Sequence, residues 1–73
     1  MSPDLPRISG EQAVKALERA GFARRSQRGS HQKLRHADGR TVIVPMHREL
    51  AVGTLRSILR QAGLRPEQFH ELL

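Results

Sequence analysis

SHQKLRHADGRTVIVP, residues 30–45, has the pattern of a β-hairpin. Residues 30–36 read as a strand of unusual pattern, with Leu34 as the one apolar side chain that would face a core. β-branched residues fill residues 41–44, which predicts a second strand. The Asp38-Gly39 pair between these segments is typical of a hairpin turn. The stretch therefore predicts two adjacent antiparallel strands.

The segment before the hairpin predicts a helix followed by another strand. Ser9 and Gln12 have the spacing of a capping box, and apolar residues recur at helical spacing after them. Gly21 is placed to end this helix, because glycine readily adopts the left-handed conformation found at many helix ends. Residues 22–28 read as a strand, which Gly29 interrupts.

The segment after the hairpin predicts two further helices. Residues 53–62 carry apolar side chains at i, i+3, i+4 and i+7, and Gly63 is placed to end the helix. Pro66 fits the first turn of a short third helix. The order α-β-β-β-α, with a short C-terminal helix, predicts an α+β fold. Its three-stranded antiparallel sheet carries the helices on one face and leaves the other face open.

Length and composition limit the classes of protein. The 73 residues suffice for one domain and contain no cysteine, which excludes disulfides and thiolate metal sites. No apolar run is long enough for a membrane span, and the first residues lack the pattern of a secretory signal. We expect a single cytoplasmic domain over residues 1–73, with residues 1–7 as a loose arm and no membrane partner.

The charge indicates a polyanionic partner. Thirteen Lys and Arg residues stand against seven Asp and Glu residues, for a net charge of +6, and most of the thirteen are Arg. Guanidinium groups bind phosphate bidentately, so nucleic acid is the first expectation. Only two aromatic residues of the Phe, Trp and Tyr type are present, which argues against a surface that stacks bases.

The open face of the sheet carries residues suited to RNA cleavage. Alternation places His31, Lys33 and Arg35 on that face, and Arg28 ends the preceding strand. Cleavage through the 2′-hydroxyl of RNA needs a proton acceptor, a proton donor and positive charge beside the phosphate. Imidazole suits the proton transfer, and Lys and Arg suit the phosphate, without a metal or a cofactor. A merely solvated polar strand has the same appearance, so both interpretations stay open.

Other polar residues permit two interpretations each. Gly29 and Ser30 are ordinary turn residues, but Gly29 would also let a phosphate approach the backbone. His47 is either a second acid or base or a loop surface residue, and His36 is expected to be a surface group beside the turn. The four histidines lack the regular spacing of metal ligands, so we expect no metal site.

Three segments, in this order, resemble the HicA toxin family. They are GSHQK at residues 29–33, DGRTVIVPMH at residues 38–47 and GTLRSILRQAG at residues 53–63. The resemblance spans about residues 8 to 70. It implies a double-stranded-RNA-binding-like fold, an mRNA endonuclease (mRNA interferase) that arrests growth, and a HicB-type antitoxin that covers the active face.

The resemblance also implies roles for individual residues. The family's catalytic histidine corresponds to His31, which we expect to act as general acid or base. We expect Arg28, Lys33 and Arg40 to bind the phosphate and Ser30 to orient the substrate.

Two departures from the family and three alternative functions remain. Gln32 stands where many members have a second histidine, and we expect Gln32 to face the core. The loop between His47 and Leu50 is short compared with that of many members, so no role in gripping RNA is assigned to it. The chain is alternatively a non-catalytic double-stranded-RNA-binding module, or an inactive toxin copy that only binds its antitoxin. A third alternative is a protein-binding module that uses the exposed edges of the sheet.

Overall fold

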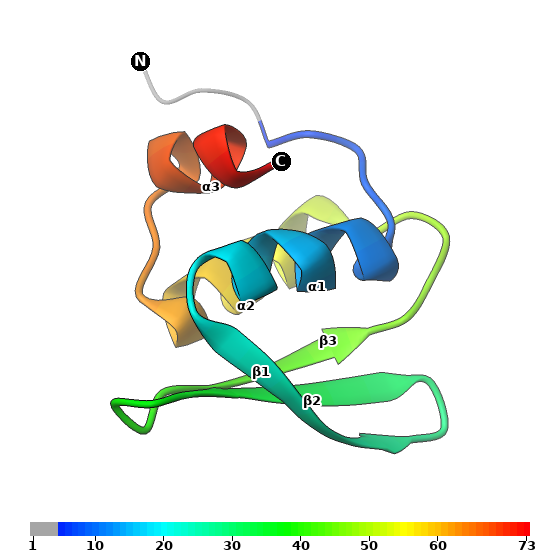
Figure 1. The fold of residues 1–73 in the computed structure, drawn as a ribbon. Helices are drawn as coiled ribbons and strands as arrows, with labels where there is room; N and C mark the ends of the chain where they lie inside the picture. Colours follow the sequence, from blue (N-terminus) through cyan, green and yellow to red (C-terminus); the bar gives the residue numbers. More distant parts are fainter. Residues whose placement is uncertain (1–4) are drawn as a thin grey trace.

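The computed structural model describes residues 5–73 as a sheet with helices on one side (Figure 1). In chain order its elements are α1 (Gly10–Arg19), β1 (Phe22–Arg28), β2 (His31–His36), β3 (Thr41–Pro45), α2 (Val52–Ala62) and α3 (Pro66–Leu72). The predicted α+β order is confirmed. No helix within residues 5–73 is long and apolar enough to cross a membrane.

The three strands form one antiparallel sheet in the order β1-β2-β3. Side chains of the central strand alternate as predicted: Gln32 and Leu34 are buried, whereas His31, Lys33 and Arg35 are exposed. The helices lie over the buried side, as Figure 1 shows. We call the other side the open face. Its exposed side chains include Ser26, Arg28, His31, Lys33, Arg35 and Ile43.

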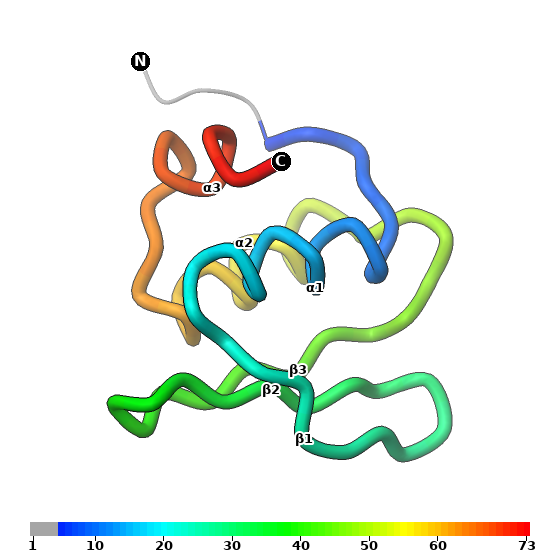
Figure 2. The backbone as a smooth tube through the Cα atoms, viewed as in Figure 1, coloured from blue at the N-terminus to red at the C-terminus, as the bar shows by residue number. Residues whose placement is uncertain are grey.

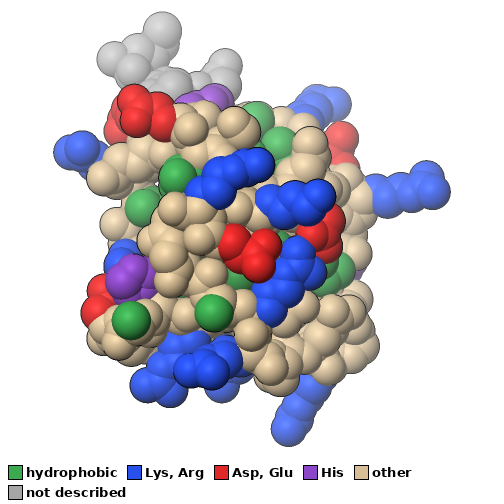
Figure 3. Space-filling model, viewed as in Figure 1, with side chains coloured by type: hydrophobic (Ala, Val, Ile, Leu, Met, Phe, Trp, Pro, Cys, Tyr) green, Lys and Arg blue, Asp and Glu red, His purple; other side chains and the backbone are tan. Residues whose placement is uncertain are grey.

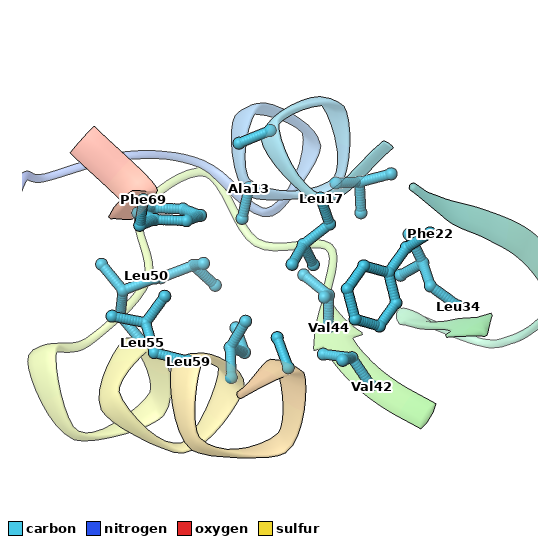
Figure 4. Close-up of a cluster of buried hydrophobic side chains, with 14 of the residues drawn as sticks. Ala13, Leu17, Phe22, Leu34, Val42, Val44, Leu50, Leu55, Leu59 and Phe69 are labelled. Carbon is cyan, nitrogen blue, oxygen red and sulfur yellow. The ribbon is translucent and has the colours of Figure 1, made fainter. Parts of the chain in front are cut away.

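A continuous apolar core joins the sheet to the helices (Figure 4). Leu17 of α1 and Leu55 of α2 pack with Leu34 and Val44 of the sheet, and α3 contributes Phe69. All five side chains are fully buried. Burying a leucine or phenylalanine side chain contributes about 1.5–3 kcal/mol, so this core holds the layers together.

The ends of α1 are formed by the residues that the sequence predicts. Gln12 donates its backbone N–H to Ser9 Oγ at 3.1 Å, and Ser9 donates its own to Gln12 Oε1 at 2.9 Å. Gly21, just past the helix, has φ +99°. Gly10 lies so close to the end of β3 that a Cβ there would be 2.2 Å from the Pro45 carbonyl oxygen. Close packing therefore requires glycine at this position.

The predicted loose arm is only partly described. Residues 1–4 lie outside the described residues. Leu5 packs against the core, and the Ile8 carbonyl accepts the Leu50 N–H at 2.8 Å. Within the described part of the predicted arm, Leu5 is therefore packed rather than loose, whereas Arg7 is exposed.

Two connections meet at one end of the molecule. Figure 2 shows the turn between β1 and β2 and the loop over residues 46–51 at the same end of the chain path. The beginnings of β2 and α2 consequently lie at this end, and the turn at Asp38 and Gly39 lies at the other. This arrangement brings the first residue of β2, His31, close to the first turns of α2.

Candidate active site

His31 lies on the central strand of the sheet, at the end of the molecule where β2 and α2 begin. It begins β2, directly after the turn formed by Gly29 and Ser30, and its side chain is exposed. Its cross-strand partners are Arg28 in β1 and Pro45 in β3. Directly paired residues point to the same face of a sheet, so Arg28 lies beside His31 on the open face.

A β-bulge in β1 determines which arginine reaches the open face. The register shifts between Arg24, which pairs with Leu34, and Ser26, which pairs with Lys33. In a regular strand, Arg24 and Arg28 would share a face because they are four residues apart. The extra residue at the bulge reverses the alternation, so Arg24 turns to α1 and Arg28 turns to His31.

The contacts of Arg24 confirm its orientation. Its guanidinium pairs with Glu11 and lies 3.6 Å from the Glu18 carboxylate, both on α1. The hydrogen bond from Arg24 lowers the pKa of Glu11, and the same bond raises the pKa of Arg24. This group of charges is thus satisfied on the helical side of the sheet.

Gln32 holds the bulge from the core side. The side chain is 5% exposed and donates from Nε2 to the Ser26 carbonyl at 2.8 Å and the Lys33 carbonyl at 3.2 Å. The expectation that Gln32 faces the core is confirmed. Its amide satisfies a carbonyl at the irregular point of β1, and thereby supports the register that brings Arg28 beside His31.

Two hollows adjoin His31. The first, of about 200 Å³, is lined by Ser26, Arg28, His31, Lys33 and Ile43. It brings together three predicted site residues, namely Arg28, His31 and Lys33. The second, of about 410 Å³, lies between β3 and α2 and is lined on the helix side by Gly53, Thr54, Ser57, Ile58 and Gln61.

Ser30 lies in the exposed turn directly before His31. The preceding Gly29 has φ +55°, and a Cβ there would meet nothing within 4 Å. Backbone conformation therefore accounts for the glycine, because residues with a side chain rarely adopt this φ. The exposed position of Ser30 is consistent with its predicted contact with substrate.

Arg40 lies away from the other predicted site residues. It precedes Thr41, which pairs with Arg35, whereas His31 pairs with Pro45 at the other end of the hairpin. Its guanidinium donates to the Ala62 carbonyl at the end of α2, and lies 5.2 Å from the centroid of the Phe22 ring.

Arg40 also holds Asp38. Arg40 Nε lies 2.9 Å from Asp38 Oδ2. The hydrogen bonds that Asp38 accepts from the side chain and the backbone N–H of Arg40 lower the pKa of Asp38 to about 2. Together these contacts favour a structural role for Arg40, whereas substrate binding by this residue stays a prediction.

The other histidines lie outside both hollows. The His36 ring flanks the turn as predicted; it is half-buried, at 24% exposure, because it packs edge-on against Phe22 at 5.1 Å. His47 is exposed in the loop before α2, and His70 lies on α3. His31 is thus the histidine among residues 5–73 that adjoins the two hollows.

Positive charge surrounds His31 without a nearby acid in the sheet. None of the three strands contains Asp or Glu. Figure 3 shows Lys and Arg side chains gathered beneath the sheet, in the same view as Figure 1. An anionic substrate is therefore attracted to the surface that displays the imidazole.

Sequence analysis did not identify Thr54, Ser57 and Gln61. The signal was a polar stripe at i, i+3 and i+7 along α2. Such a stripe cannot be distinguished from the solvated side of an amphipathic helix, because only the position of β3 makes it one wall of a hollow.

The fold and the site together define a class of protein. The chain is a basic α+β domain of the double-stranded-RNA-binding-like type, with a histidine exposed among cations on its open sheet face. Residues 10–64 match the family model described as the HicA toxin of bacterial toxin–antitoxin systems, and the chain belongs to this family. A comparison with curated proteins finds no match.

Proposed function

We propose that this chain is a toxin that cleaves mRNA in the cytoplasm without a metal, with His31 as general acid or base. The observation that carries the proposal is the cross-strand pairing of Arg28 with His31, beside Lys33, on a strand surface free of acids. Membership of a toxin family supports a harmful activity, and the arrangement of these three side chains supports its chemistry.

In the proposed reaction the substrate supplies its own nucleophile. The 2′-oxygen forms a bond to the adjacent phosphorus, and the bond from phosphorus to the 5′-oxygen breaks. One proton leaves the 2′-hydroxyl and one is delivered to the 5′-oxygen, and His31 performs one of these transfers. The products are a 2′,3′-cyclic phosphate and a 5′-hydroxyl.

The cations act on the charge that develops at phosphorus. Arg28 and Lys33 flank His31 in the smaller hollow, where they bind the phosphate and stabilise the additional negative charge of the transition state. Ser30, in the adjoining turn, orients the RNA chain. Arg40 has no part in this proposal because its guanidinium is engaged by Asp38 and the end of α2.

The test compares the native chain with His31→Ala and His70→Ala. Cells that express the native chain should stop growing and lose mRNA. Cells that express His70→Ala should do the same, because this control histidine lies far from the open face. His31→Ala should be harmless, with an unchanged circular dichroism spectrum and retained RNA affinity. Magnesium-dependent products with a 5′-phosphate would overturn the mechanism, and RNA binding without any cleavage would identify a binding module instead.

We further propose that a HicB-type antitoxin covers the open face. Because the three strands contain no acid, the docking surface of the antitoxin should be acidic. Affinity for the antitoxin should fall with added salt and with Arg28→Ala. A complex in which His31 stays accessible to RNA would contradict occlusion of the site.

A further inference from the structure

The larger hollow has two chemically different walls. On the sheet side lie Ile43 and Pro45, and Ile43 is 39% exposed. On the helix side lie the polar side chains of Thr54, Ser57 and Gln61. At about 410 Å³ the hollow is within the usual range of small-molecule sites, roughly 300–1,000 Å³. An apolar wall beside a polar wall suits a flat heterocycle with polar edges.

A chain of hydrogen bonds determines the polarity of the helix wall. The Ile43 N–H of β3 donates to Gln61 Oε1 at 3.0 Å, and a backbone N–H has no alternative to donating. The Gln61 amide is therefore oriented with Nε2 towards Ser57, to which it donates at 3.1 Å. Ser57 Oγ is thus an acceptor in this chain.

The consequence is a free donor in the hollow. The Ser57 hydroxyl has one proton, and no group among residues 5–73 accepts it. Gln61 also has a second Nε2 proton that this chain of bonds does not use. Ser57 Oγ also keeps one lone pair, so these two side chains offer the hollow two donors and one acceptor, and the preferred group opposite them is an acceptor.

We propose that this hollow holds the base of a nucleotide next to the cleaved phosphate, and that Ser57 selects a base with a carbonyl oxygen, rather than an amino group, at C4 of a pyrimidine or C6 of a purine. The inference rests on the proposed RNA cleavage, because His31 lines both this hollow and the smaller basic one. Uracil and guanine present a carbonyl oxygen where cytosine and adenine present an amino group. An amino group could use only the remaining lone pair of Ser57 Oγ, and it would leave the Ser57 proton and the second Gln61 Nε2 proton without an acceptor on the base.

The first experiment compares RNA oligonucleotides that differ by uracil or cytosine at one position beside the cleaved bond. A net hydrogen bond corresponds to about 2- to 12-fold, so we expect the native chain to cleave the uracil substrate faster by such a factor. Ser57→Ala should lose most of this preference and still cleave both. The variant should fold, because alanine is the better helix former.

A second variant is expected to invert the preference. In Gln61→Glu one carboxylate oxygen accepts the Ile43 N–H and the other accepts the Ser57 proton. Ser57 then presents only lone pairs to the hollow, so cytosine should be cleaved faster than uracil. The added negative charge slows cleavage of both substrates, but it leaves their ratio as a readout of polarity.

Failure of this inference is distinguishable from failure of the proposed function. If all three proteins cleave at the same positions with equal base preference, base selection by Ser57 is wrong and the His31 site stands. If the native chain cleaves no RNA, the proposed function fails, and base selection fails with it.

Discussion

Replacing Arg40 with alanine separates the support of the fold from the binding of RNA. The guanidinium donates to the Ala62 carbonyl and pairs with Asp38 at 2.9 Å. It also lies 5.2 Å from the centroid of the Phe22 ring. These contacts join the hairpin turn, the end of α2 and the beginning of β1, and none of them involves the surface around His31.

The magnitude follows from these three contacts. An exposed cation–π contact contributes about 0.5–1 kcal/mol, and an exposed ion pair about 0–1 kcal/mol. A hydrogen bond from a charged donor contributes about 1 kcal/mol when it is partly solvated. Because the contacts share one side chain, we expect Arg40→Ala to lower the free energy of unfolding by about 2 kcal/mol. For a domain of this size that corresponds to a fall in Tm on the order of 10 °C.

The assay is thermal unfolding followed by circular dichroism, together with RNA cleavage well below the Tm. Arg40→Ala should unfold at lower temperature and still cleave RNA, whereas His31→Ala should keep its Tm and lose cleavage. Arg56→Ala, an exposed position on α2, is the matched control and should stay within about 0.5 kcal/mol. An unchanged Tm for Arg40→Ala would refute the structural role, and loss of cleavage by the folded variant would show that Arg40 serves the substrate.

Three further predictions concern stability. A Cβ added at Gly53 meets nothing within 4 Å, whereas one at Gly10 overlaps the backbone at the end of β3. Chemical denaturation should therefore show Gly53→Ala to be more stable by about 0.5–1 kcal/mol and Gly10→Ala to be much less stable; equal effects would contradict the packing. The pKa of Asp38 is lowered to about 2 by its hydrogen bonds with Arg40, so its contribution to stability is present above about pH 4 and is lost as the pH falls through 2. The Tm deficit of Asp38→Asn should accordingly shrink between pH 4 and pH 2, and a deficit that grows with acid would reverse the sign. Gln32→Leu removes the donor to the Ser26 carbonyl, and should cost about 1–3 kcal/mol and reduce cleavage by releasing the bulge; a stable, fully active variant would show that the bulge does not need the amide.

The elements of the fold were predictable because their signals are local. The capping box at Ser9 and Gln12, the stop at Gly21 and the turn at Asp38-Gly39 each depend on residues within a few positions of one another. Backbone sterics and short-range hydrogen bonds act at that distance, whatever the rest of the chain does. The strand and helix bounds consequently agree with the sequence to within about one residue.

Predictions for single side chains were weaker where a distant partner decides the environment. His36 was expected at the surface and is only partly exposed there, because the pairing of β1 with β2 makes it a direct neighbour of Phe22, on which the ring packs. Leu5 was expected in a loose arm, but the core reaches it. In both cases the burial depends on contacts between segments distant in sequence.

The sequence by itself determined the α-β-β-β-α order and the face on which His31 and Lys33 stand, because a period of two is a property of any strand. Only the tertiary structure decided that Arg28 rather than Arg24 joins them, since one extra residue at the bulge reverses the alternation. It alone placed Ser57 of α2 beside the site, because the packing of a helix against a sheet edge depends on the whole core.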